Sequence, residues 1–402
     1  MRAYLLTMLF AAVITFLGTF ATLKISHKYK LYPQIRARDS HTRPTPRLGG
    51  VAMFGGFLAA MIFSSSLGWF QSVFVEPGRV MAIVAAAFLI TLIGFLDDLY
   101  DLDWTLKLAG QFVVAGILAW QGVQIVSLPI GGITIGSFGL SFVATVFLTV
   151  LVMNAVNFID GLDGLVAGVV LIGTTVFFAY SYLLAQQTSP TNYFNLASLL
   201  SSIVIGMCVG FLPFNWHPAK IFMGDGGALV VGMLMAVSTI SVTGQIDPGI
   251  DRSQLVPAFI PLLLPFAVLI VPLLDFGLAV LRRLRAGKSP FSADRKHLHH
   301  RLLDMGHSHL QAVLILYSWT AVVSIGFLLF FIVKPYAIAV VFLIVGTIVS
   351  AVLTILPLTR RQRVEKTIQS LKDDAVLYRR VLPRDFRALA EPLGITAPEV
   401  VE

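Results

Sequence analysis

The sequence predicts an all-α, polytopic integral membrane protein with about eleven transmembrane helices. Of its 402 residues, 57% are hydrophobic and only 12% are charged, whereas a soluble domain carries about 25% charged residues. Eleven apolar runs approach the length of roughly 20 residues that a membrane-spanning helix requires. Lys and Arg gather in alternate connections between these runs. Together these observations exclude a soluble enzyme.

Each predicted span corresponds to one apolar run. The first run has only Arg2 before it and no small-residue cleavage site, so we interpret it as a retained helix rather than a removed signal peptide. Only a short polar break separates the fifth run from the sixth, which leaves ten or twelve spans as alternatives. In order, the predicted spans cover residues 3–23, 49–69, 80–96, 107–125, 138–158, 164–184, 196–214, 228–246, 257–274, 312–332 and 336–357.

The basic residues predict the orientation of the bundle. The connections after the odd-numbered spans, together with the C-terminal segment, hold 25 of the 29 Lys and Arg residues. Because cytoplasmic loops carry the excess of Lys and Arg, the N-terminus is predicted outside and the C-terminus in the cytoplasm. This topology accounts for the net charge of +8, and we expect no nucleic-acid partner. We predict two domains, a transmembrane catalytic domain over 1–357 and a cytoplasmic C-terminal tail over 358–402.

Aspartates gather at the ends of predicted spans on the basic side. Ionised groups this close to hydrocarbon are costly and usually have a function. Carboxylates bind Mg²⁺, which also takes substrate phosphate oxygens, and basic side chains bind the remaining phosphate charge. The pattern therefore indicates metal-assisted phosphoryl transfer at the inner membrane surface. The aspartates are Asp97, Asp98, Asp101, Asp103, Asp160, Asp163, Asp225 and Asp275.

Some of these acids have structural alternatives. Asp103 has the position of an N-cap for the following span, and Asp275 could pair with nearby arginines. Asp225 could also cap a helix, but the glycines after it would let backbone amides approach a phosphate. If their segments are helical, Asp97 shares a face with Asp101, and Asp160 with Asp163.

A basic loop from Arg282 to His309 holds five of the eight histidines. A charged surface loop or a histidine-rich metal tract are the alternatives. Because His297, His299 and His300 lie among basic residues, the loop favours imidazole and guanidinium donors for phosphate over a second cation.

Five ordered motifs carry a family resemblance. They are RDSHTRPTPRLGG, GFLDDLYDLDWTLKLAGQ, NAVNFIDGLDGLVAG, PAKIFMGDGGALVVG and SADRKHLHHRLLDMGHSH. Over about residues 1–357 the chain resembles the polyprenyl-phosphate N-acetylhexosamine-1-phosphate transferases. Leu298 interrupts the three consecutive histidines common in the branch that uses UDP-MurNAc-peptide. The resemblance therefore favours the WecA/TagO-like branch, which uses UDP-GlcNAc.

The resemblance implies roles for individual residues. Asp97 and Asp98 match an aspartate pair that acts on the lipid phosphate, and Asp225 matches the principal Mg²⁺ ligand. Asp160 matches a catalytic position near the metal, and we expect it to share the Mg²⁺ with Asp225. The remaining matches are His297 as a further catalytic residue and, for substrate binding, Lys107, Asn154, Asn157, Gly226, His299, His300 and Arg301.

The function implied is transfer of GlcNAc-1-phosphate from UDP-GlcNAc to a polyprenyl phosphate, such as undecaprenyl or decaprenyl phosphate, with release of UMP. This is the first membrane step of a cell-envelope polysaccharide, at a bacterial plasma membrane with the site facing the cytoplasm. Mg²⁺ is the expected cofactor, with Mn²⁺ as the alternative, and a homodimer is compatible with the resemblance. Alternatives are another UDP-N-acetylhexosamine or UDP-MurNAc-peptide as the donor, a transporter, or a scaffold that binds anionic lipid.

Overall fold

The computed structural model describes residues 1–31, 45–125, 137–188, 194–243, 270–285, 287 and 298–356. Every regular element in these ranges is a helix. The chain divides into two compact units, residues 1–351 and 352–402. The elements up to α12, on which the site depends, belong to the first.

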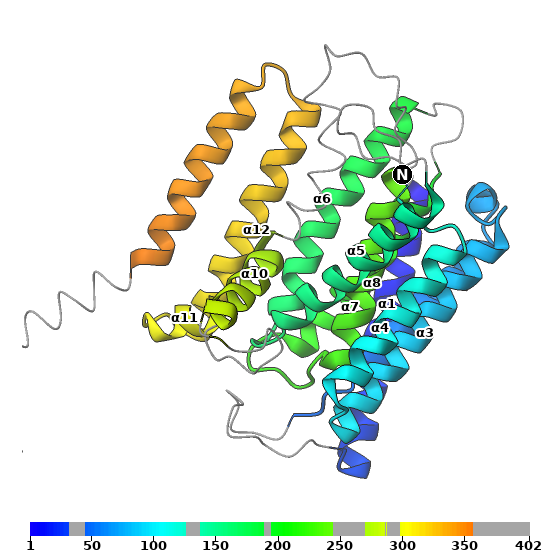
Figure 1. Cartoon of the computed structure of the whole chain (residues 1–402), viewed down its shortest axis with the longest axis horizontal. Helices are drawn as coiled ribbons and strands as arrows, with labels where there is room; N and C mark the ends of the chain where they lie inside the picture. Colours follow the sequence, from blue (N-terminus) through cyan, green and yellow to red (C-terminus); the bar gives the residue numbers. More distant parts are fainter. Residues whose placement is uncertain are drawn as a thin grey trace, which may run out of the picture. The chain divides into compact units, whose positions relative to one another are not determined.

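Figure 1 shows the helices in sequence order. They are α1 (Arg2–Tyr29), α2 (Gly49–Ser65), the 3₁₀ helix η1 (Gly68–Val73), α3 (Pro77–Tyr100), α4 (Trp104–Trp120), α5 (Phe138–Phe158), α6 (Leu165–Thr188), α7 (Leu196–Asn215), α8 (Gly224–Thr243), α10 (Ile270–Arg285), α11 (Leu298–Asp304) and α12 (His309–Ile332). A further helix covers Ala337–Leu356.

The described helices confirm an all-α polytopic membrane protein. Eight are long and apolar enough to cross a membrane, and α2 and α4 are shorter apolar helices. These ten coincide with ten of the predicted spans, whereas the span predicted at 257–274 lies mostly outside the described residues. The count of eleven and the orientation stay predictions. The predicted tail at 358–402 also lies outside the described residues.

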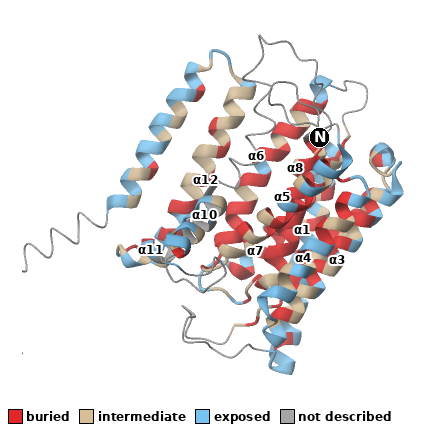
Figure 2. Cartoon of the chain, viewed as in Figure 1, coloured by how far each residue is buried: buried red, intermediate tan, exposed pale blue. Residues whose placement is uncertain are grey.

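Helix α8 forms the centre of the bundle (Figure 2), in contact with α2, α3, α5 and α7. All of residues 226–238 are buried. Small residues allow close approach between helices. In lipid the hydrophobic effect does not drive helices together, so close packing of this kind is typical of their contacts. A Cβ added to Gly232 would lie 2.9 Å from Cα of Met153 on α5. A glycine also allows close contact between α7 and α1, where a Cβ added to Gly206 would lie 2.3 Å from the carbonyl oxygen of Met8.

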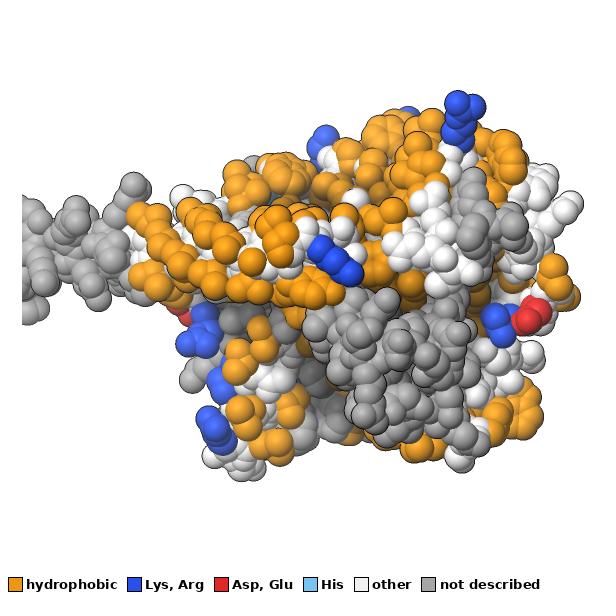
Figure 3. Space-filling model, turned by 90° about the horizontal axis from the view of Figure 1, so that it is seen from above, with side chains coloured by type: hydrophobic (Ala, Val, Ile, Leu, Met, Phe, Trp, Pro, Cys, Tyr) orange, Lys and Arg blue, Asp and Glu red, His pale blue; other side chains and the backbone are white. Residues whose placement is uncertain are grey.

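An aromatic cluster fixes the N-terminal end of α1. The ring of Tyr4 lies 5.2 Å from Phe70 of η1, 5.4 Å from Phe178 of α6 and 5.5 Å from Phe194 just before α7. The N-terminus therefore lies beside the connections that follow α2 and α6. Figure 3 looks onto this end, where the described side chains are mainly hydrophobic and few are charged.

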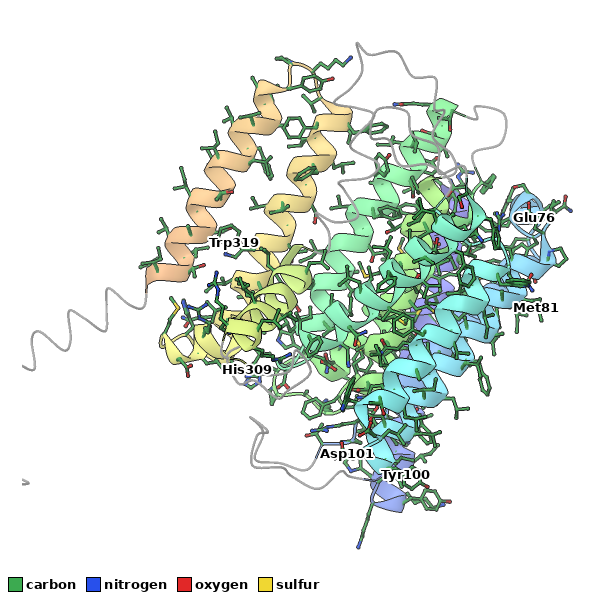
Figure 4. All side chains as sticks on the ribbon, in the orientation of Figure 1. Glu76, Met81, Tyr100, Asp101, His309 and Trp319 are labelled. Atoms are coloured by element: carbon green, nitrogen blue, oxygen red, sulfur yellow. The ribbon has the colours of Figure 1, made fainter. Side chains whose placement is uncertain are left out.

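The aspartates lie at the other end of the helices. Figure 4 shows Glu76 at one end of α3, and Tyr100 and Asp101 at the opposite end. The separation of acids from the N-terminal end agrees with the alternation expected from the loop charges.

Candidate active site

Backbone hydrogen bonds fix the start of α8 against the start of α2. The amide of Phe222 donates to the carbonyl of Pro46 (2.8 Å), and the amides of Gly49 and Gly50 donate to the carbonyls of Phe222 (3.0 Å) and Met223 (2.9 Å). Gly224 then turns the chain with φ of +69°, a conformation that favours glycine. The position of Asp225 is therefore determined by main-chain contacts on its N-terminal side.

Two glycines bring α3 against the same end of α8. A Cβ added to Gly94 would lie 2.3 Å from both Cα and N of Gly226. Because no side chain separates the two helices here, Asp97 and Asp98, at the C-terminal end of α3, come close to Asp225.

Lys107 of α4 lies between two of the carboxylates. Its Nζ donates to Oδ2 of Asp97 at 2.6 Å and also bonds to Oδ2 of Asp225. The exposed fractions of the three side chains are 22% for Lys107, 10% for Asp97 and 26% for Asp225. The site is thus open to small solutes, yet its charges are less screened than those of a surface ion pair.

The remaining contacts of Asp225 involve α3 and α5. Its own amide donates to Oδ1 of Asp98 at 3.3 Å, and the amide of Gly226 donates to the same carboxylate. The Nδ2 of Asn157, on α5, donates to Oδ2 of Asp225 at 3.4 Å. Asp98 therefore binds the amides at the start of α8, and Asn157 helps to orient the Asp225 carboxylate.

Asp160 lies in the turn between α5 and α6, where its amide donates to the carbonyl of Asn157 at 3.2 Å. Burial, and then the negative charge of Asp225, raise the pKa of Asp160 to about 7, although Arg47 acts in the opposite direction. Asp160 is therefore within electrostatic reach of Asp225. We refer to Asp97, Asp98, Asp160 and Asp225 as the carboxylate cluster.

The donor set of the carboxylate cluster fits a hard divalent cation. Its ligands are carboxylate oxygens, the type that Mg²⁺ prefers. Oδ1 of Asp97 is buried and has no hydrogen-bond partner among the described residues, so it has an unused lone pair. The ammonium group of Lys107 already bridges Asp97 and Asp225, which demonstrates that this position favours positive charge.

Other predicted residues lie apart from the cluster. Asn154 is one helical turn before Asn157, and its Nδ2 bonds to Oε1 of Gln111 and to the Val150 carbonyl (2.8 Å). Its predicted role at the nucleotide stays a prediction.

Asp103 is the N-cap of α4, since its Oδ1 accepts the amide of Thr105 at 2.8 Å, and this alternative is confirmed.

The two helical pairings of acids do not form. Asp101 has φ of 54° and ends α3, so it does not continue the face of Asp97. Asp160 and Asp163 lie between α5 and α6 and share no helical face. Gly164, with φ of +75°, leads into α6 and explains the break.

The histidine loop is described only in part. His297 lies outside the described residues, and the backbone of His299 and His300 belongs to α11. Arg301 is exposed on the same helix. The predicted roles of these four residues remain predictions.

Two residues that we did not predict position the Asp160 turn. Oδ1 of Asn215 accepts the amide of Gly164 at 3.0 Å, while its Nδ2 donates to the Ile221 carbonyl at 3.0 Å. The hydroxyl of Tyr317, on α12, donates to the Gly164 carbonyl. A polar Asn at the end of an apolar span is the only sequence signal for the first, and Tyr317 has none, because its partner is distant in sequence.

The chain is similar to known phosphosugar transferases. Residues 80–243 match the model of glycosyl transferase family 4. The chain is 39% identical, over 90% of its length and 92% of the relative, to the decaprenyl-phosphate N-acetylglucosaminephosphotransferase of Mycobacterium leprae. It is 34% identical, over 75% of its length and 78% of the relative, to a probable undecaprenyl-phosphate N-acetylglucosaminyl 1-phosphate transferase of Bacillus subtilis.

A third relative represents the other donor class. The phospho-N-acetylmuramoyl-pentapeptide-transferase of Halalkalibacterium halodurans is 33% identical over 61% of this chain and 77% of its own length. The higher identity and coverage of the first two relatives favour the N-acetylglucosamine branch. These names give no support to the transporter or scaffold alternatives.

Proposed function

Since this chain belongs to glycosyl transferase family 4, in the branch that transfers GlcNAc-1-phosphate to a polyprenyl phosphate, we propose that its carboxylate cluster binds Mg²⁺ and that UDP-GlcNAc is the donor. The observation that carries this proposal is Nζ of Lys107 between Asp97 of α3 and Asp225 of α8. Acids from separate helices and a cation-favouring position occur together there. This is the combination that a nucleoside-diphosphate site with a divalent cation needs.

The proposed reaction joins the lipid phosphate to the sugar phosphate. A phosphate oxygen of the polyprenyl phosphate attacks the sugar-proximal phosphorus of UDP-GlcNAc, and the bond from that phosphorus to the UMP oxygen breaks. The products are polyprenyl diphosphate-GlcNAc and UMP. Such a transfer needs in-line positioning and neutralised charge more than covalent participation by the protein.

We assign the cation to Asp225 and Asp160, with Oδ1 of Asp97, which accepts no hydrogen bond from the described residues, as a further candidate oxygen. When bound, Mg²⁺ would withdraw negative charge from the diphosphate. Lys107 supplies a second positive charge. Its ammonium group can donate a hydrogen bond to a phosphate oxygen while it keeps its hydrogen bond to Asp97. Asp98 holds the amides at the start of α8 and so keeps Asp225 in place.

Asp97 has two roles to consider. It orients the acceptor phosphate, or accepts its proton, in a one-step transfer. In a two-step transfer its carboxylate attacks first and forms a phospho-enzyme. Rapid quenching with donor alone separates these routes, because only the second releases one equivalent of UMP before acceptor is added.

The membrane setting follows from the two substrates. A long isoprenoid stays in lipid, whereas a nucleotide sugar is soluble in the cytosol. We therefore propose a bacterial plasma membrane location, with the carboxylate cluster facing the cytoplasm and the product entering a cell-envelope polysaccharide. The basic residues predicted on the same side as the acids support this orientation.

An assay with purified protein tests the proposal. Polyprenyl phosphate is supplied with Mg²⁺ and, separately, UDP-GlcNAc, UDP-GalNAc or UDP-MurNAc-pentapeptide, and UMP and lipid product are measured. We expect both products with UDP-GlcNAc, and neither after the cation is chelated. Greater turnover with another donor, or turnover without a divalent cation, would contradict the donor or the cofactor assignment respectively.

A further inference from the structure

A second group of metal-ligating side chains lies beside the carboxylate cluster. It consists of Asp163 in the turn between α5 and α6, His217 between α7 and α8, and His309 at the start of α12. Figure 4 labels His309. One ligand atom from each residue lies within 4.8 Å of the others. The phosphoryl transfer proposed above assigns no role to these three side chains.

The three side chains are held in defined positions. Nδ1 of His217 lies 2.7 Å from Oδ2 of Asp163, which also accepts the amide of Ala219 at 3.1 Å. The Asp163 amide donates to Nε2 of His309 at 3.0 Å. The two imidazole rings stack with centroids 4.4 Å apart and an interplanar angle of 17°.

Their exposure suits a site that is filled from solution. The Asp163 side chain is 3% exposed, whereas that of His217 is 43% exposed. A cation could therefore reach the group past His217 and meet a carboxylate that is shielded from water. Nε2 of His309 accepts the Asp163 amide and so carries no proton, and its lone pair would bind a cation once that hydrogen bond is released.

We propose that Asp163, His217 and His309 bind a divalent transition cation, with Zn²⁺ as the representative ion. Two imidazole nitrogens and one carboxylate oxygen form a common zinc ligand set, with water as a fourth ligand. Mg²⁺ prefers oxygen ligands throughout, so it should bind here poorly. Neutral His217 would ligate through Nδ1 with its proton on Nε2, and the cation would replace its hydrogen bond to Asp163.

Binding would connect three segments that are distant in sequence. Asp163 follows Asp160 by three residues, and His217 precedes Asp225 by eight. A cation held by both would fasten the turns that carry two members of the carboxylate cluster to the start of α12. We therefore expect bound Zn²⁺ to stabilise the folded protein, independently of turnover.

Calorimetry on the full-length protein tests this site. Zn²⁺ is titrated in excess Mg²⁺ into the wild type and into H217N and H309Q, in which an amide can keep a hydrogen bond to Asp163. We expect each variant to lose one Zn²⁺ site or to bind it at least about tenfold more weakly. H27N, which changes an exposed histidine at the end of α1, should bind as the wild type does.

Thermal unfolding provides the second readout. In excess Mg²⁺, which occupies the carboxylate cluster, Zn²⁺ should raise the melting temperature of the wild type and of H27N, but not that of H217N or H309Q. Unchanged Zn²⁺ stoichiometry and affinity in both variants would overturn the site. Mg²⁺ bound at the carboxylate cluster should stabilise the wild type and both variants alike, so a Mg²⁺ stabilisation that is lost in H217N and H309Q would overturn the assignment to a transition cation. If UMP release fails while these results hold, only the proposed function is contradicted.

Discussion

Lys107 governs the charge balance of the carboxylate cluster. Its ammonium group contacts Asp97 and Asp225, and these side chains are mostly shielded from water. Ion pairs in such surroundings interact more strongly than exposed pairs. Lys107 therefore competes with a divalent cation for the carboxylates, and it also offers a positive charge to a phosphate.

Replacing this lysine should separate the two effects. We expect Lys107→Met to lower turnover by about 10²- to 10³-fold, the cost of losing one donor that stabilises developing charge. The concentration of Mg²⁺ for half-maximal activity should also fall, because no ammonium group opposes the cation. Steady-state assays over a range of Mg²⁺ concentrations measure both quantities. Lys107→Arg, which keeps the charge, serves as the control, and an increased requirement for Mg²⁺ in Lys107→Met would contradict the competition.

The carboxyl group of Asp160 predicts a pH dependence of stability. Its pKa rises from 3.8 to about 7 because of burial and the Asp225 charge. The folded protein thus holds this proton more tightly than the unfolded chain does. The resulting contribution to the free energy of unfolding is full below pH 3.8 and is lost as the pH rises to about 7.

Asp160→Asn should remove this dependence. Without divalent cations, the melting temperature of the wild type should fall more than that of the variant between about pH 5 and about pH 7.5. The corresponding difference in the free energy of unfolding is at most about 1.4 kcal/mol per pH unit. Scanning calorimetry in detergent measures the difference. Parallel curves for the two proteins would show that Asp160 titrates near its ordinary pKa.

At the scale of elements, the contact between α3 and α8 positions three of the acids. Gly94 and Gly226 allow the two backbones to touch. Asp97 and Asp98 follow Gly94 by three and four residues, and Asp225 directly precedes Gly226. The sequence motifs around Asp97 and Asp225 predicted that these acids have a function. They did not predict that the glycines form a helix contact, because periodicity does not identify the neighbouring helix.

A methyl group at this contact should disturb the site. We expect Gly94→Ala to destabilise the protein by about 1–3 kcal/mol, the usual cost of overpacking, and to lower turnover by displacing Asp97. Gly55→Ala on α2 is the matched control, because its Cβ would meet nothing within 4 Å. Melting temperature and UMP release are measured on both variants. Equal behaviour of the two would contradict the role of the glycine contact.

At the scale of the whole molecule, the topology determines which substrates can meet the acids. α3 carries Glu76 just before its first residue and Tyr100 as its last, so these residues report opposite ends of one helix. Cys208 is buried and is the one cysteine of the chain. A cysteine-free background therefore needs a single substitution.

Labelling in intact cells tests the orientation. In the Cys208→Ala background, we expect Glu76→Cys to react with a membrane-impermeant maleimide from outside. Tyr100→Cys should react only after permeabilisation, because the positive-inside rule predicts that this end faces the cytoplasm. The reverse pattern would place the carboxylate cluster outside, away from a cytosolic nucleotide sugar.

Much of the fold could be predicted because a helix that crosses a lipid bilayer needs a run of roughly 20 apolar residues. Apolar runs gave ten helices that the structure describes, and local chemistry correctly identified Asp103 as an N-cap. The sequence predicted that aspartates gather at one end of the bundle, but not which individual side chains from distant segments make contact. The Asp163, His217 and His309 group forms from three segments, and Tyr317 reaches Gly164 from α12, so no local pattern reveals either contact.

Asp225→Asn is the most direct test that the carboxylate cluster, whose residues come from separate helices, binds the cation of the active site. UMP release from UDP-GlcNAc by purified protein, with polyprenyl phosphate and Mg²⁺, should fall by at least about 10²-fold, because an amide is a weaker ligand than a carboxylate. Asp103→Asn is the matched control, since Asn is also a good N-cap, and its turnover should equal that of the wild type. Wild-type turnover in a correctly folded Asp225→Asn protein would show that the carboxylate cluster is not the active centre.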